Sequence, residues 1–491
     1  MNTATSAGIT ILGLGPGDAS LLTRQAWDWL CSISEVALRT RRHPVVADFP
    51  SSLKIVSFDE LYDHSEESCE AVYEKIVEKV LELGQRSQGV TYAVPGQPFI
   101  AEATAPEIAR RAREMGIPLR VIEGMSFLEP SFTALGMDPL PQTTLVDAMQ
   151  LSTLHHPSFP PDAPALIAQV DSPSTASKIK LTLRAVYPDV YPVKLIHAAG
   201  TPQQVVEDLP LSEIDESEKI GALTSLYVPP LAEGTSLEAF QELIAHLRAP
   251  DGCPWDRKQT HETLRKHLLE ETYETLEAMD QEDPAAMCEE FGDLLLQIVL
   301  NAQVGWEKDE FTMADILKGI YDKIVRRHPH VFGDVEVDGV SGVLQNWEKL
   351  KAKERKDNGT AETKGLLDGV PRVFPALAQS HEYQDRAARV GFDWKDVEGV
   401  YAKVEEELAE VRSAPDEAAR GREVGDLLFS VVNLARWLHV DAEAVLRETN
   451  VRFRTRFAHI EDEARRRGLT PADLSLEEMD RLWEEAKEEE E

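Results

Sequence analysis

The spacing of apolar residues changes near the middle of the chain. Before residue 229, short apolar runs such as 9–14 and 90–94 alternate with amphipathic stretches such as 103–114. This alternation predicts strands and helices in turn, which is an α/β domain. After residue 237, apolar residues recur at three- and four-residue steps, and this period predicts helices. The predicted fold is therefore multidomain, with an N-terminal α/β domain followed by two all-α helical bundles.

Two polar segments predict the domain boundaries. Residues 228–236 (VPPLAEGTS) and 351–364 (KAKERKDNGTAETK) are rich in linker residues. The helical scheme that precedes the second linker is repeated after it, which indicates a duplicated domain. The predicted domains are 1–229, 237–356 and 366–490.

One stretch of the helical half, residues 268–297, combines helical apolar spacing with regularly placed carboxylates. Glu271 and Glu274 lie three residues apart and so share one helix face, as do Glu290 and Asp293 on the next predicted helix. If the two helices form a hairpin, the four carboxylates converge and repel one another unless a cation joins them. Mg²⁺, which prefers oxygen ligands, suits such a site.

The same arrangement recurs in the second helical domain, displaced by 133 to 136 residues. An acidic helix by itself is usually a solvated face, but a duplicated spacing within apolar helices favours a metal site. The second set of carboxylates comprises Glu407, Glu410, Glu423 and Asp426.

Each copy also carries two basic residues four positions apart and, further on, a tryptophan. A metal can bridge phosphate oxygens, basic side chains can hold a polyphosphate, and an indole can stack on a base, so the set predicts a nucleoside triphosphate site. A solvated basic face and a core tryptophan are the alternative. The residues are Lys323, Arg327 and Trp347 in the first copy and Arg452, Arg456 and Trp483 in the second.

The two copies differ in ways that favour the second as the main hydrolytic site. Asn433 lies seven residues after Asp426 on the same helix face, where the first copy has Leu300. An amide can hold a ligand or a substrate hydroxyl, whereas a leucine cannot. The second copy also has two arginines where the first has a lysine and an arginine, and arginine binds phosphate through two parallel donors.

A glycine-rich turn follows the first apolar run of the α/β domain. Its residues are Gly13, Gly15, Gly17 and Asp18. A strand, a glycine turn and a helix in this order bring backbone close to a ligand, although the spacing differs from the dinucleotide fingerprint.

Composition narrows the possible partners. The net charge of −36 argues against a general nucleic-acid binder, which needs a basic surface, but allows a small phosphorylated ligand bound through a metal. The four cysteines are scattered and predict no disulfide framework. With no apolar run of 18 residues and no evident signal peptide, the sequence predicts a cytoplasmic protein without a membrane span.

Several segments of the helical half resemble the MazG family: LRAPDGCPWDRKQTHETLRKHLLEETYE, GDLLLQIVLNAQ and RRHPHVFGDV. The family signature, EExxE followed by ExxD, begins here at Glu270 and again at Glu406. The resemblance implies magnesium-dependent hydrolysis of nucleoside triphosphates to monophosphate and pyrophosphate, by dimers of helical bundles. In that reaction Glu270 or Glu406 is expected to order the attacking water as a base.

The α/β domain resembles the tetrapyrrole methylases, which use S-adenosylmethionine. The resemblance is carried by ITILGLGPGDASLLTRQAW, YAVPGQPFIAEATAPEIARRARE and VIEGMSFLEPSFTALGMDPL. It implies that the glycine turn and Gly96 bind that cofactor. Gln97 and Ala19 replace the family's usual Asp and Pro, and these departures weigh against methyl transfer more than against cofactor binding.

Two rival functions follow from the same residues. The chain could act chiefly as a methyltransferase with the helical half as a scaffold, which requires methyl transfer to an acceptor. It could also be a regulatory protein that binds nucleotides with little release of pyrophosphate.

Overall fold

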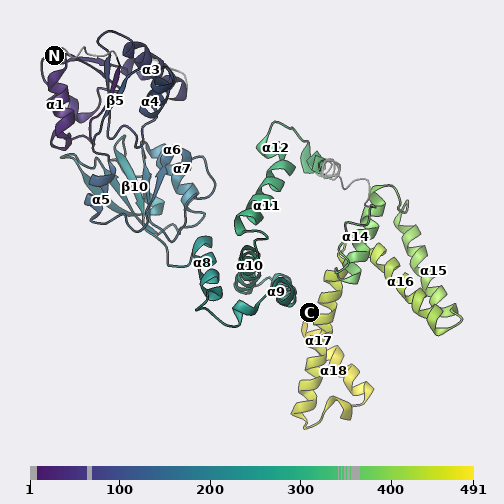
Figure 1. Cartoon of the computed structure of the whole chain (residues 1–491). Coiled ribbons are helices and arrows are strands. Elements are labelled where there is room, and N and C mark those ends of the chain that lie inside the picture. Colours follow the sequence, from purple (N-terminus) through teal and green to yellow (C-terminus); the bar gives the residue numbers. More distant parts are fainter. Residues whose placement is uncertain are drawn as a thin grey trace. The chain divides into compact units, whose positions relative to one another are not determined.

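The chain divides into two compact units, 1–257 and 258–491, which are described separately below (Figure 1). The computed structural model describes residues 8–63, 69–340, 342–343, 346–347, 350, 354 and 365–490. The predicted linker at 351–364 therefore lies outside the described residues, apart from Glu354. The limits of the two predicted helical domains stay predictions.

The first unit begins with a parallel sheet of strand order β3-β2-β4-β1-β5. Leu12 and Leu30 belong to the core between this sheet and α1, while Ile11 and Ile108 belong to the core against α3 and α4 on the other face. The elements are β1 (Ile9–Gly13), α1 (Arg24–Ser32), β2 (Glu35–Leu38), β3 (Lys54–Ser57), α3 (Cys69–Gly84), β4 (Val90–Val94), α4 (Thr104–Glu114) and β5 (Leu119–Ile122).

A second, mixed sheet of order β6-β7-β10-β8-β9 completes the α/β fold. Strands β6 and β7 are parallel, whereas β10 runs antiparallel to both β7 and β8. The elements are α5 (Leu128–Leu135), β6 (Thr144–Asp147), α6 (Ala148–Leu151), β7 (Ala165–Ala168), α7 (Pro173–Leu183), β8 (Pro192–His197), β9 (Val205–Pro210) and β10 (Thr224–Val228). The predicted α/β class is confirmed.

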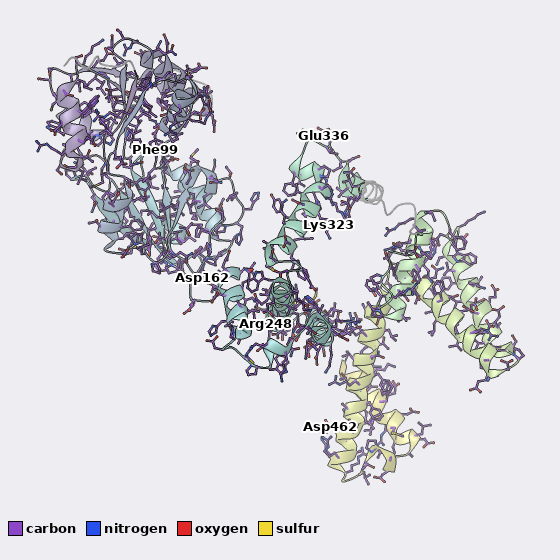
Figure 2. The ribbon with its side chains drawn as sticks, viewed as in Figure 1. Phe99, Asp162, Arg248, Lys323, Glu336 and Asp462 are labelled. Atoms are coloured by element: carbon purple, nitrogen blue, oxygen red, sulfur yellow. The ribbon has the colours of Figure 1, made fainter. Side chains whose placement is uncertain are left out.

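Helix α8 (Leu237–Arg248) also belongs to the first unit. Ser236 is its N-cap and accepts a hydrogen bond from the backbone N–H of Ala239. The Ser236 hydroxyl in turn donates to Asp162 at 2.7 Å, in the loop before β7 (Asp162 is labelled in Figure 2). This contact ties the start of the helix to the second sheet.

The second unit is helical, as the sequence predicted. Helices α9 and α10 pack as a hairpin, and so do α15 and α16. Asp283 caps α10 by accepting from two backbone N–H groups, and Pro284 occupies its first turn, so the polypeptide reverses at the predicted break. The helices are α9 (His261–Asp280), α10 (Pro284–Glu307), α11 (Met313–Arg327), α12 (Pro329–Phe332), α14 (Ala376–Arg389), α15 (Val397–Ser413), α16 (Glu417–Trp437), α17 (Ala442–Arg466) and α18 (Leu476–Glu490).

Candidate metal centres and cofactor turn

The hairpin of α9 and α10 brings three of the predicted carboxylates together. Oxygens from Glu271, Glu274 and Glu290 all lie within 4.8 Å of one another. Two come from adjacent turns of α9 and the third from α10, because the short turn at Asp283 sets the helices side by side. Asp293 adds its charge to the same cluster and helps to raise the pKa of Glu271.

The hairpin of α15 and α16 repeats this geometry. Oxygens from Glu407, Glu410 and Glu423 lie within the same 4.8 Å limit. Asp426 follows Glu423 by three residues on α16 and therefore lies on the same side of that helix. The duplicated carboxylate spacing thus produces a duplicated cluster.

Burial and neighbouring negative charges shift the pKa of several of these carboxylates. Burial, followed by the charge of Asp293, raises the pKa of Glu271, and burial followed by Glu274 raises the pKa of Glu290. In the second cluster, burial followed by the charges of Glu407 and Glu423 raises the pKa of Glu410. A divalent cation would favour the ionised forms and remove the repulsion.

The surroundings of Glu407 indicate whether a metal ion fits the second cluster. The Glu407 side chain is buried, at 5% exposure, and Oε2 has no hydrogen-bond partner among the described residues. A buried carboxylate oxygen without a donor is costly, and coordination to a metal would satisfy it. The donor set, carboxylates only, is the one that Mg²⁺ prefers. The residues present therefore fit a magnesium ion.

The glycine turn of the first unit is closely packed against neighbouring backbone. Gly15 and Gly96 are both left-handed, with φ of 72° and 66°, and exchange backbone hydrogen bonds at 3.2 and 2.8 Å. A Cβ at Gly13 would lie 2.5 Å from the backbone nitrogen of Gly124. Gly17 is also constrained, since a Cβ there would lie 2.7 Å from a Thr201 methyl carbon.

A small cavity of about 130 Å³ opens beside this turn and is lined by Gly15, Gly96 and His43, among others. Asp18 does not line it. Its carboxylate accepts from the Ser20 hydroxyl at 2.6 Å and from the Ser20 backbone at 2.8 Å, which lowers the pKa of Asp18. Gly15 and Gly96 therefore border this cavity, whereas Asp18 caps the following turn.

Comparison with known proteins matches both halves. Residues 8–215 match the family model for tetrapyrrole (corrin/porphyrin) methylases, and residues 259–332 match that for the MazG nucleotide pyrophosphohydrolase domain. The chain is 42% identical to YabN of Bacillus subtilis over 98% of each chain. The chain belongs to the MazG family, in its YabN-type fusion with a tetrapyrrole methylase domain.

Two relatives match about half of this MazG-family chain. The nucleoside triphosphate pyrophosphohydrolase/pyrophosphatase MazG of Thermotoga maritima is 45% identical over 50% of this chain and 95% of its own length. The nucleoside triphosphate pyrophosphohydrolase of Escherichia coli K12 is 42% identical over the same shares.

The second MazG cluster contains a lysine that the sequence reasoning missed. Lys403 Nζ lies 2.8 Å from Glu407 Oε1 and 3.1 Å from Glu406 Oε1. His267 occupies the matching position of the first copy, with Nδ1 3.5 Å from Glu270 Oε2. The four-residue step from Lys403 to Glu407 is the sequence signal for this contact, but it is not duplicated, because the first copy has a histidine at that position.

Glu406 and Glu270, the predicted bases, lie beside the clusters rather than within the three-carboxylate sets. Their side chains are about half exposed, at 56% and 50%. A group in this position is accessible to a water molecule and is not enclosed by the other carboxylates. Their role as bases stays a prediction.

The structure brings Arg456 and Trp483 together in the second copy. The Arg456 guanidinium lies 5.6 Å from the centre of the Trp483 ring, and Phe453 packs against the same ring at 5.1 Å. Arg452 contacts Glu448 at 3.7 Å and donates to Thr449 at 2.8 Å. Trp483 thus packs between α17 and α18, as the core alternative expects, and its contact with a substrate stays a prediction.

In the first copy the corresponding residues are held differently. Arg327 pairs with Glu354 at 2.7 Å, and this contact lowers the pKa of Glu354 to about 2. Trp347 lies 6.4 Å from the ring of His328. Lys323 is exposed on α11 (Figure 2).

Asn433 belongs to a polar network on α16. Its side-chain oxygen accepts from the Arg436 guanidinium at 3.0 and 2.9 Å, and Arg436 also pairs with Asp393 at 2.6 Å. The matching Leu300 is a buried core residue. The two copies therefore differ in packing at this position, and a ligand contact by Asn433 stays a prediction.

Among the described residues, none of the helices has the length and apolar character needed to span a membrane.

Proposed function

We propose that this chain hydrolyses nucleoside triphosphates to nucleoside monophosphate and pyrophosphate with the aid of Mg²⁺. The observation that carries the proposal is the convergence of three carboxylates in each hairpin, together with a buried Glu407 oxygen that no described residue contacts by a hydrogen bond. The MazG relatives from Thermotoga maritima and Escherichia coli, both named nucleoside triphosphate pyrophosphohydrolases, support the same reaction.

The proposed metal ligands are the four carboxylates of each copy. A bound Mg²⁺ would polarise a water molecule and neutralise phosphate oxygens. Glu406 or Glu270 would accept the proton of the water that attacks phosphorus. In the second copy, Arg452 and Arg456 hold the charge of the departing pyrophosphate, and Trp483 borders the base.

We assign most of the turnover to the second copy. Lys403 places an additional cation at its cluster, where the first copy has His267. Together with the arginine pair and Asn433, it gives the second copy more groups able to contact a polyphosphate. The first copy contributes nucleotide binding or slower hydrolysis through Lys323, Arg327 and Trp347.

The test is pyrophosphate release by the intact chain from a panel of nucleoside triphosphates, with Mg²⁺ and with EDTA. The proposal expects release that requires the metal. Tight nucleotide binding with no release would support the regulatory alternative, and methylation of an acceptor without release would support the methyltransferase alternative.

We further propose that the first unit binds S-adenosylmethionine at the turn formed by Gly13, Gly15, Gly17 and Gly96. The support is the left-handed backbone at Gly15 and Gly96 beside a cavity. Calorimetry with S-adenosylmethionine on the intact chain should detect binding, and an absence of heat at saturating ligand would reject the assignment.

A homodimer is the proposed assembly, and a cytoplasmic location is the proposed setting. Both hairpins expose the same stripe of apolar side chains, at matched positions of α10 and α16 spaced four and three residues apart. Stripes of this kind require a partner surface, either the other copy or a second chain. The exposed residues are Phe291, Leu295 and Ile298 on α10 and Val424, Leu428 and Val431 on α16.

A further inference from the structure

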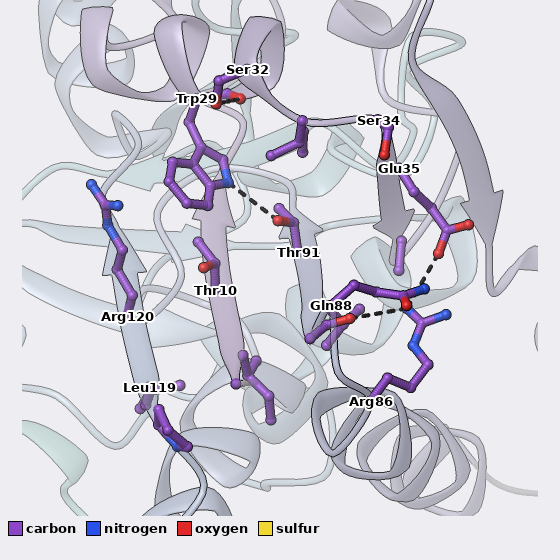
Figure 3. Close-up of a pocket in the computed structure, with 17 residues that line it drawn as sticks. Thr10, Trp29, Ser32, Ser34, Glu35, Arg86, Gln88, Thr91, Leu119 and Arg120 are labelled. Atoms are coloured by element: carbon purple, nitrogen blue, oxygen red, sulfur yellow. Dashed lines mark hydrogen bonds and ion pairs between the residues drawn. The ribbon is translucent and has the colours of Figure 1, made fainter. Parts of the chain in front are cut away.

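A second cavity lies at the opposite edge of the first sheet from the glycine turn. It has a volume of about 680 Å³ and surrounds the amino ends of β1, β2, β4 and β5 (Figure 3). The methylase-like turn follows the carboxyl end of β1, which is the usual ligand edge of a parallel sheet. The cavity is therefore separate from the proposed S-adenosylmethionine site.

The floor of this cavity is a polar row across three strands. Thr10 of β1 is in register with Thr91 of β4 on one side and with Arg120 of β5 on the other. Side chains at paired positions of neighbouring strands point to the same face, so two hydroxyls and a guanidinium lie in line. The face is the one that α1 covers, since Leu12 on the same strand packs with Leu30.

Trp29 of α1 covers this row. Its indole N–H donates to the Thr91 hydroxyl at 3.2 Å, and the Arg120 guanidinium lies 4.4 Å from the centre of its ring (Figure 3). Because the Thr91 oxygen accepts from Trp29, its own O–H can still donate to a ligand. The cavity thus combines a flat aromatic surface, hydroxyl donors and a cation.

The charge of the lining favours an anion. Glu35 is the carboxylate that lines the cavity, and it is already paired with Arg86 at 3.2 Å and Lys54 at 2.7 Å. Arg120 stacks on Trp29, and no carboxylate among the described residues pairs with it. A cationic pocket in a chain of net charge −36 attracts a negatively charged ligand against the general trend of the surface.

We propose that this cavity binds a nucleoside monophosphate. Arg120 contacts the phosphate in a fork, Thr10 and Thr91 donate to the sugar, and the Trp29 indole borders the base. The volume is far larger than a phosphate ion needs and falls within the range of small-molecule sites. The choice of nucleotide rests on the proposed function, because the helical half would release nucleoside monophosphate.

The test is calorimetry on the intact chain in EDTA, with AMP, GMP, CMP, UMP and inorganic phosphate as separate ligands. EDTA removes the metal that the carboxylate clusters would need to bind phosphate, and the dependence of the remaining binding on Arg120 assigns it to the first unit. At least one monophosphate should bind with one equivalent per chain, and Arg120→Gln should weaken it by about tenfold or more. Arg113→Gln, which removes an exposed arginine of α4 outside the cavity, should leave binding unchanged.

Three results would overturn the proposal: no binding of any monophosphate, equal effects of the Arg120 and Arg113 variants, or phosphate binding as tightly as every nucleotide. A Glu271→Gln/Glu407→Gln double variant should retain the Arg120-dependent binding, because its changes lie in the helical unit. If the chain binds a monophosphate through Arg120 but releases no pyrophosphate, the proposed hydrolysis is rejected and the nucleotide pocket is supported. If the chain releases pyrophosphate but shows no such binding, only the pocket assignment is rejected.

Discussion

Lys403 and Glu407 form an ion pair at 2.8 Å inside the second carboxylate cluster. Four residues separate them on α15, so the lysine lies one turn before the carboxylate that it contacts. Glu407 is buried and uses only one oxygen in this pair, which leaves Oε2 available to a metal. The lysine therefore reduces the net negative charge of the cluster but leaves a carboxylate oxygen for a metal ion.

Lys403→Met is expected to lower pyrophosphate release about tenfold or more, because a cation near the phosphates is lost. It should also lower the Mg²⁺ concentration for half-maximal activity, since Glu407 loses the charge that competes with the metal. Lys403→Arg keeps the charge and should retain much of the activity. Equal Mg²⁺ dependence in the methionine variant and the parent chain would contradict this account.

Glu407→Gln should reduce pyrophosphate release by about a hundredfold, because it removes a metal ligand from the copy with the fuller set of cations. Glu271→Gln, the matched change in the first copy, should leave much of the release intact. Both variants can be compared with the parent chain in one magnesium-dependent assay. If the Glu271 variant is the inactive one, the assignment of the main site to the second copy is wrong.

The backbone geometry of the glycine turn predicts how much different glycine substitutions destabilise the first unit. Gly96→Ala meets no atom within 4 Å but must adopt a left-handed φ of 66°, which costs about 1–2 kcal/mol. Gly13→Ala places a Cβ 2.5 Å from the Gly124 nitrogen and should cost more, because backbone must move. Urea unfolding should rank the two variants in this order, and Gly96→Asn, which tolerates the left-handed region, should be milder than Gly96→Ala.

His43 predicts a pH dependence of the first unit. Burial lowers its pKa from 6.5 to about 4, because the charged imidazolium is disfavoured inside the protein. In the unfolded chain the His43 imidazole binds a proton below pH 6.5, whereas in the folded chain it does so only below about pH 4. Above pH 6.5 the imidazole is neutral in both states and does not affect the free energy of unfolding. As the pH falls from 6.5 towards 4, protonation favours the unfolded chain, so the free energy of unfolding decreases by on the order of 2–3 kcal/mol.

The measurement for His43 compares urea unfolding of the parent chain and His43→Gln between pH 7 and pH 4. The variant cannot take up this proton and should lose less stability over the interval. A parallel decline of both proteins would show that other groups control the acid sensitivity.

Local patterns in the sequence predicted much of the helical half. The three-residue steps of Glu271/Glu274 and the Asp283-Pro284 break were sufficient for the hairpin and its cluster, because helix periodicity and capping act within a few residues. The polar row of Thr10, Thr91 and Arg120 could not be predicted in the same way. These residues are far apart in the chain, and their alignment depends on strand register, which tertiary packing sets.

The exposed stripes on α10 and α16 carry the prediction on assembly. Leu428 is 55% exposed and Leu295, its counterpart, is 39% exposed, so each lies on an apolar helix face open to a partner. A charge at either position would be desolvated by such a partner and should weaken the association. Leu428→Glu is therefore expected to shift the mass measured by light scattering from twice 54.7 kDa towards one chain.

Leu181→Glu, at an exposed site on α7 with 63% exposure, serves as the control and should leave the mass unchanged. A parent chain that already has the mass of one chain would reject the homodimer and favour pairing of the two copies within the chain.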